Sequence, residues 1–491
     1  MRACLPARAV FTAAILAAPA LAFGSERSLA HPADAGARAA LDLVYDGNFH
    51  GAEAWLSALA REHADDPVLP YLQALALEWR LEQDPASRAG EAEVLALADR
   101  ALGLAGARLA RDPADGRALL ARGAAHGVKS RLRLFRWEKG PASREAVRMR
   151  EALVAARAAG AEGLDLDFGL GLYDYYADTL PRFFRLVAFV LRIPGGDRER
   201  GLERVARVAR GGSLFHDDEA RVQMYDIHSY FERRPDRALH WIREMWRRHP
   251  GWPIWGLKLS QQLGEPMGLW AQSAAVAREI VATAEAGHHP NYQPVVAAMA
   301  RVLLAEAYLG DLRFEEARAA ALAARAGAPA APWVSERAER VLARCLDLEL
   351  RAGSPDVRAV SLLAQSRRLR EQGDEPSAEA VCRRAFQSFP ASEEGRLCAA
   401  RESLRQGRPA AARELARAVL GGEGVDWLRP FARLVLARAL EGEGEHARAL
   451  DLYRRAWEEP LGREELRAEA AGAIRRLDPA AAIPDAPPLE R

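Results

Sequence analysis

Two short stretches of this sequence gather residue types that bind metal ions. LFHDDEA holds a histidine followed by three acids (216–219), and GHHPNY holds a histidine pair (288–289). Metal ligands must converge on one point, whereas consecutive residues of a regular element point to different sides. Capping of a helix by Ser213 or Asp217 accounts for the acids. The histidine pair lacks a third ligand at a zinc-site spacing. We therefore expect no metal and no cofactor.

The sequence also lacks the common motifs of nucleophilic and phosphate chemistry. It contains no G-x-S-x-G nucleophile elbow and no P-loop. The glycines of GLGLY (169–173) follow no strand, so they do not form a dinucleotide-binding fingerprint. Carboxylates far apart in the chain could still converge in a cleft. The expectation is a protein that is not an enzyme, with a carbohydrate-active or hydrolytic envelope enzyme on a helical toroid as the alternative.

Aromatic residues are concentrated in the middle third of the chain. Packing between helices explains most of them, but aromatic and arginine side chains are also favoured in binding hot spots. Some of these side chains are therefore candidates for a groove that binds a protein or peptide. The candidate partner-binding residues are Tyr173, Tyr175, Tyr176, Arg182, Arg185, Trp252 and Trp255.

The stretch LPRFFRLVAFVLRIPGG (180–196) is the most apolar outside the N-terminus. Proline at its start and Pro-Gly-Gly at its end predict a helix over 180–193, which is too short to cross a bilayer. Arg182, Arg185 and Arg192 fall on one side of this helix, and apolar residues fill most of the rest. We expect the apolar surface to be buried in protein. Peripheral contact with a membrane is the alternative.

Composition bounds the remaining possibilities. The 491 residues are 49% hydrophobic and 28% charged, which suits a folded chain with a buried core. The net charge of +1 argues against a nucleic-acid partner. Abundant Ala, Leu, Arg and Glu favour helices.

The N-terminal segment 1–22 has the pattern of a secretory signal peptide. Arg2 and Arg8 give a positive start, a short apolar run follows, and Ala20-Leu21-Ala22 matches a cleavage site. A retained anchor helix is the alternative, but the run is shorter than a membrane span. The expected location is the periplasm, or secretion, after cleavage.

Three cysteines remain after the signal peptide. They are Cys345, Cys382 and Cys398, with no C-x-x-C pair among them. An oxidising compartment would permit a bridge between Cys382 and Cys398 if they lie on neighbouring helices. Three buried thiols are the simpler expectation.

Apolar and small residues recur with a fixed pattern along the chain. A key alanine is followed by small or apolar residues four and seven positions later and often by proline at twelve. In several copies a small residue also lies twelve positions before it, at Ala40, Ala305, Ala400 and Ala437. Small residues allow two antiparallel helices to approach closely. The key alanines are Ala52, Ala238, Ala317, Ala378, Ala412 and Ala449.

This pattern resembles the tetratricopeptide repeat, a helix–turn–helix unit of about 34 residues. The step from Ala378 to Ala412 matches this repeat length, and the step from Ala412 to Ala449 is slightly longer. The predicted fold is an all-α solenoid. Its predicted parts are a signal peptide (1–22), N-terminal helical repeats (23–160), a central segment (161–260), C-terminal repeats (261–475) and a flexible Pro/Ala-rich tail (476–491).

The central segment carries a further resemblance. It contains GLGLYDYY (169–176), GGD (195–197), Gly201-Leu202, Gly211-Gly212 and the repeat from Ala238 to Pro250. These features resemble the tetratricopeptide-repeat-39 and inclusion-body-clearance family of the mitochondrial outer membrane, together with its bacterial relatives. The resemblance implies a helical adaptor without known catalysis and identifies no substrate. The predicted function is an exported scaffold for protein–protein interaction, such as an envelope adaptor or assembly factor.

Overall fold

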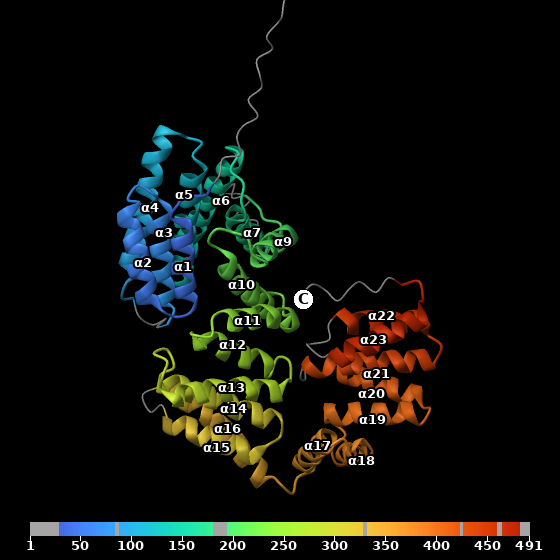
Figure 1. Ribbon diagram of the computed structural model, residues 1–491. Coiled ribbons are helices and arrows are strands. Elements are labelled where there is room, and N and C mark those ends of the chain that lie inside the picture. The colour runs from blue at the N-terminus through green and yellow to red at the C-terminus, as the bar shows by residue number, and fades with distance from the viewer. Residues whose placement is uncertain are drawn as a thin grey trace, which may run out of the picture.

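The protein is a superhelix of antiparallel helix pairs (Figure 1). The computed structural model describes residues 29–83, 88–179, 194–327, 331–422, 426–458 and 464–481. Over these residues the chain forms helices and no β-strand, which confirms the predicted all-α helical-repeat fold.

The described helices are named in chain order. In the first half they are α1 (Asp34–Tyr45), α2 (Phe49–Glu62), α3 (Val68–Leu81), α4 (Glu91–Arg111), α5 (Gly116–Phe135), α6 (Lys139–Ala158), α7 (Leu164–Thr179), α9 (Arg198–Ala209), α10 (Asp217–Asp226), the π-helix η1 (Ile227–Phe231), α11 (Pro235–Arg248) and α12 (Pro253–Leu263). In the second half they are α13 (Trp270–Ala286), α14 (Pro294–Gly310), α15 (Phe314–Gly327), α16 (Pro332–Leu350), α17 (Pro355–Glu371), α18 (Glu375–Ser388), α19 (Glu393–Arg405), α20 (Pro409–Leu420), the 3-10 turn η2 (Asp426–Leu428), α21 (Arg429–Gly442), α22 (His446–Glu458) and α23 (Glu464–Leu477).

The key alanines of the repeat pattern lie where paired helices touch. All six are fully buried, on α2, α11, α15, α18, α20 and α22. The small residues twelve positions earlier are also fully buried, on the preceding helices α1, α14, α19 and α21. The predicted contacts between small residues are therefore confirmed.

A hydrogen bond marks the same position in two further pairs. The Ser366 hydroxyl on α17 donates to the carbonyl of Ala378 on α18, at 2.7 Å. The Ser130 hydroxyl on α5 donates in the same way to the carbonyl of Ala142 on α6, at 2.9 Å. Serine satisfies its hydroxyl there while keeping the helices as close as alanine does. The pair α5–α6 is therefore built like the others, although its sequence pattern is degenerate.

The N-terminal repeats begin with three helices, α1 to α3, and a turn at 63–67 separates α2 from α3. The predicted signal peptide, the helix at 180–193 and residues 482–491 of the tail lie outside the described residues. Within the described part of the chain, no helix combines the length and apolar character required to cross a membrane.

The expectation of three buried thiols is wrong. A disulfide joins Cys382 on α18 to Cys398 on α19, and the buried Cys345 is the free cysteine. These helices are consecutive and antiparallel, and they bring the two Cα atoms to 6.0 Å, within the range that a disulfide requires.

The stack changes direction at the turn 351–354, between α16 and α17, and the last helices return toward α11 (Figure 1). Arg367 on α17 holds this joint, because its guanidinium donates to the Gly310 carbonyl at 2.6 Å and pairs with Glu394 at 2.8 Å. On the returning side, Trp427 packs so closely on Gly268 that a Cβ there would lie 2.6 Å from the indole. The returning helices are thereby in direct contact with the turn before α13.

Candidate functional site

Close backbone contact explains the glycines of the central segment. Helices α7 and α9 cross at Gly171 and Gly201, where a Cβ on Gly201 would lie 2.4 Å from the Tyr175 nitrogen. A Cβ on Gly196 would lie 2.1 Å from the Asp174 carbonyl oxygen. Only glycine fits such approaches. This part of the GLGLYDYY and GGD pattern therefore serves helix packing.

The predicted binding residues of this region are held by packing and hydrogen bonds. Tyr173 is buried, and its hydroxyl donates to the Pro194 carbonyl at 2.7 Å. Tyr175 is fully buried, and its hydroxyl donates to Glu232 at 2.6 Å. Tyr176 is half-buried and donates to Gln223 at 3.3 Å. Of these three rings, Tyr176 keeps the most accessible surface.

The two tryptophans predicted to bind a partner connect the N-terminal helices to α12. Trp255 is fully buried, and its indole nitrogen donates to the Tyr45 carbonyl at 2.7 Å. Trp252 is half-buried and packs edge-to-face on Phe49, with ring centroids 5.2 Å apart. The candidates Arg182 and Arg185 lie outside the described residues.

The side chains of the LFHDDEA stretch diverge, as expected. His216 lies between the Tyr71 hydroxyl, at 2.6 Å, and the Asp165 carboxylate, at 2.8 Å. Glu219 accepts hydrogen bonds from Tyr45 at 2.9 Å and from Trp79 at 2.8 Å. Both groups thus bond to α3, and His216 also bonds to α7 whereas Glu219 also bonds to α1.

The capping explanation for these acids needs correction. His216 occupies the N-cap of α10 and makes no side-chain cap. The Asp217 carboxylate instead accepts from the Ser213 nitrogen at 2.8 Å in the preceding loop. The Ser213 hydroxyl accepts from the His216 nitrogen at 2.9 Å, which organises the approach to the helix.

One group of potential metal ligands occurs among the described residues, formed by Asp42, Asp218 and His249. Asp218 already accepts from Arg248 at 3.0 Å and from Arg221 at 2.5 Å, and its second oxygen lies 3.1 Å from His249. Burial would raise the pKa of Asp218, but the bond from His249 and the two arginines outweigh it and leave that pKa low. A cation would have to displace these positive partners, so the group does not fit a metal.

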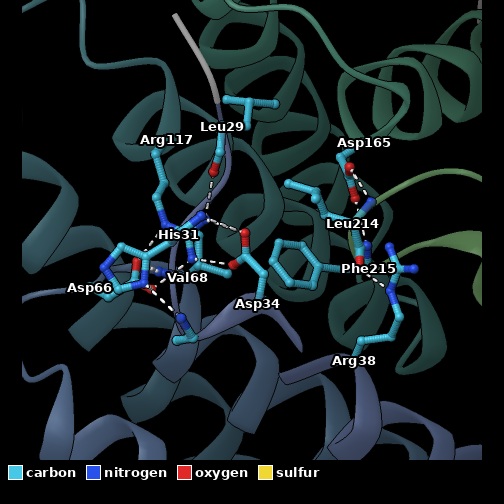
Figure 2. Close-up of polar contacts among 11 residues, drawn as sticks. Leu29, His31, Asp34, Arg38, Asp66, Val68, Arg117, Asp165, Leu214 and Phe215 are labelled. Carbon is cyan, nitrogen blue, oxygen red and sulfur yellow. Dashed lines mark hydrogen bonds and ion pairs between the residues drawn. The ribbon is translucent and has the colours of Figure 1, made fainter. Parts of the chain in front are cut away.

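A second buried network centres on Arg117 at the start of α5 (Figure 2). Its guanidinium pairs with both oxygens of Asp66, at 2.9 and 2.7 Å, and with Asp34 at 2.8 Å. It also donates to the Leu29 carbonyl at 2.6 Å. The guanidinium thereby fixes the chain ahead of α1 and the turn before α3, and its role is structural.

A charged groove lies on the C-terminal repeats. Its volume is about 690 Å³. Helices α19, α21 and α23 contact one another in turn and form one layer, which provides much of the lining. The lining residues are Glu375, Glu379, Arg401, Leu404, Arg405, Gly407, Pro409, Arg438, Gly442 and Glu469.

An arginine recurs directly after the small residue at the helix contact in several repeats. Arg131, Arg367, Arg401 and Arg438 follow Ser130, Ser366, Ala400 and Ala437. Three of these arginines have carboxylate partners. Arg131 pairs with Glu78 at 2.6 Å, Arg367 with Glu394 at 2.8 Å and Arg438 with Glu469 at 2.7 Å. The repeat thus places a cation that usually meets an acid of a neighbouring helix.

Arg401 is the exception in this series. It is half-buried, it lines the groove, and no carboxylate of the described chain pairs with it. Its guanidinium lies over the Phe431 ring, 5.4 Å from the centroid. Burial, followed by the positive charge of Arg370, lowers the pKa of Arg401, and the negative charges of Glu469 and Glu375 offset this only in part. A negative group in the groove would relieve this cost.

The three acids of the groove do not supply that group. Glu375 pairs with Arg370 at 3.4 Å, Glu469 pairs with Arg438, and Glu379 pairs with Arg405. Sequence reasoning missed this site because it weighed the small positions and not the residues that follow them.

The described chain is thus a helical-repeat superhelix with a charged groove on its C-terminal repeats. No family model and no curated protein matches the chain. Among solved structures, the tetratricopeptide-repeat domain of P58(IPK) is 14% identical, over 84% of this chain and 99% of that one, with a TM-score of 0.22. Yeast Tom70 is 10% identical, over 90% and 95%, with a TM-score of 0.26. The likeness of the central segment to a particular family stays a prediction.

Proposed function

We propose that this protein is a scaffold that binds a protein partner through an acidic segment in the groove of the C-terminal repeats. The observation that carries this proposal is the unpaired cation of Arg401 among acids that already have partners. A carboxylate from another chain would complete the series of arginine–carboxylate pairs. Such a charge-assisted contact in a partly desolvated groove favours binding.

If Arg401 instead served to stabilise the fold, its replacement should lower the free energy of unfolding. A structural arginine stabilises its own fold, whereas an unpaired, half-buried one costs free energy that ligand binding recovers. Residues of binding sites are often retained at such a cost.

The test is capture of proteins from envelope extracts by the full chain. Arg401→Gln should weaken retention of the specific partner by at least about tenfold while leaving the free energy of unfolding unchanged or higher. Arg417→Gln, on the exposed surface of α20, is the matched control and should retain the partner. Equal retention by wild type and Arg401→Gln, or a less stable Arg401→Gln fold, would contradict the proposal.

We also propose that the scaffold is exported and works in the cell envelope, as an adaptor or assembly factor. The signal-like segment 1–22 supports export. The disulfide between Cys382 and Cys398 supports an oxidising compartment, because such bonds persist outside the reducing cytosol.

Intact mass of the protein recovered from a periplasmic fraction tests export. The expected mass is that of a chain beginning at Phe23. Ala20→Asp and Ala22→Asp should block processing, because the cleavage site requires small uncharged residues at these positions. A wild-type chain that keeps Met1 and stays in the cytoplasm would show that the proposed compartment is wrong.

A further inference from the structure

The turn between α5 and α6 exposes three large apolar side chains. Trp137 is 79% exposed, Leu134 57% and Phe135 44%. The two helices it connects are 20 residues long each and pack on one another along their length. The exposed side chains thus lie at the end of a well-supported hairpin and contribute little to its core.

The backbone holds Trp137 outward in an unusual conformation. Its φ is +61°, in the left-handed region that favours glycine. The Trp137 nitrogen donates to the Leu134 carbonyl and the Glu138 nitrogen to the Arg133 carbonyl, each at 2.9 Å, which is the arrangement that ends many helices. Leu312 ends α14 in the same arrangement with a φ of +62°, so this conformation sets the direction of Trp137 and the exposure of its ring carries the argument.

Exposed cations lie beside these apolar side chains. Residues 130–150 contain seven arginines and lysines and two glutamates, and four of the cations, Arg131, Arg133, Arg136 and Arg148, pair with carboxylates. Lys139 and Arg144 are exposed, and the Lys139 ammonium lies 5.4 Å from the centre of the Trp137 ring. The turn therefore offers aromatic and aliphatic groups framed by cations.

We propose that this turn, residues 134–139, inserts into the interface of an anionic lipid bilayer. Tryptophan prefers the headgroup level of a membrane, where its ring meets apolar chains and its N–H remains hydrated. Lysine and arginine beside it meet the anionic headgroups. A bilayer interface accepts protruding side chains without a matching hollow, whereas a folded protein partner must provide one.

Vesicle flotation of the full chain tests this proposal. Wild type should bind vesicles that contain phosphatidylglycerol, bind phosphatidylcholine vesicles more weakly, and lose affinity as salt rises. Leu134→Ser combined with Trp137→Ser should weaken binding by about tenfold or more. Trp333→Ser, at an exposed tryptophan on α16, is the matched control and should bind as wild type does.

The charge contribution is tested separately. Lys139→Gln and Arg144→Gln should each weaken binding to anionic vesicles roughly fivefold, with little effect on neutral ones. These exposed positions should leave the helical circular dichroism unchanged. All variants are compared as the chain that begins at Phe23, so that the apolar N-terminal stretch does not contribute to binding. Vesicle binding that survives the changes at 134 and 137 overturns the proposal. A wild-type protein that binds single-stranded RNA but no vesicles would also overturn the proposal.

Discussion

Replacing Arg117 by methionine should destabilise the protein by about 3–5 kcal/mol. The side chain of Arg117 is 5% exposed, and that of its partner Asp66 is fully buried. Methionine fills part of the space but leaves the Asp66 carboxylate buried without its cation, and it frees Asp34 and the Leu29 carbonyl (Figure 2). Breaking a buried pair in this way is among the most costly single changes.

Chemical denaturation with urea measures this effect. Arg111→Met, at the exposed last residue of α4, is the control and should change the free energy of unfolding by less than about 0.5 kcal/mol. A triple variant that combines Arg117→Met with Asp34→Asn and Asp66→Asn should recover part of the lost stability. In this variant no buried carboxylate is left without its cation. A single Arg117→Met variant as stable as wild type would contradict the structural role of this network.

The helix pairs could be predicted from the sequence because their contacts repeat. Ala378 and Ala412 lie at equivalent positions of successive units, and a close helix contact tolerates few residue types. A constraint that recurs in unit after unit is visible even when each copy is weak.

The joints between units could not be predicted in this way. Arg367 meets Gly310 and Glu394, and Trp427 meets Gly268, in contacts that each occur once and link residues far apart in the chain. Contacts of this kind leave no repeated pattern in the sequence. The curvature of the superhelix follows from them, so it becomes apparent only in three dimensions.

The predicted site and the proposed one differ for a related reason. Aromatic residues attract notice in a sequence, but Tyr175 and Trp255 are fully buried because large rings also fill the gaps between helices. Arg401 is one of many arginines in the sequence, and it stands out only because its equivalents Arg367 and Arg438 have carboxylate partners. Whether an arginine has a carboxylate partner depends on which side chains the fold brings together, and the sequence alone does not give this.

Lowering the pH from 7.5 to 4.5 should cost the wild type about 2–3 kcal/mol of stability through His228 alone. This histidine lies in η1 and is 3% exposed, and its Nδ1 has no hydrogen-bond partner. Burial, followed by the positive charge of Arg237, lowers its pKa from 6.5 to about 4. The acids Glu232 and Asp236 act in the opposite direction but do not offset burial.

The direction of this pH effect depends on whether the folded or the unfolded state binds the proton more readily. Between pH 6.5 and about 4 the unfolded chain protonates this histidine and the folded chain does not, so acid favours unfolding. The contribution is complete above pH 6.5 and is lost progressively down to about pH 4. Half-buried Asp226, whose pKa is raised mainly by its desolvation, has the opposite effect, because the folded state takes up its proton first.

Comparison with a variant isolates the histidine from these other groups. His228→Gln cannot take up the proton, so the stability difference between wild type and variant should shift by about 2–3 kcal/mol in favour of the variant between pH 7.5 and 4.5. The half-buried His126, whose pKa burial also lowers, is changed to glutamine as the control. That replacement should leave the contribution of His228 in place, because the two histidines lie on separate helices. Suppose instead that the difference in free energy of unfolding between wild type and His228→Gln stays constant across this pH range. That result would show that His228 accepts a proton in the folded state as readily as in the unfolded chain.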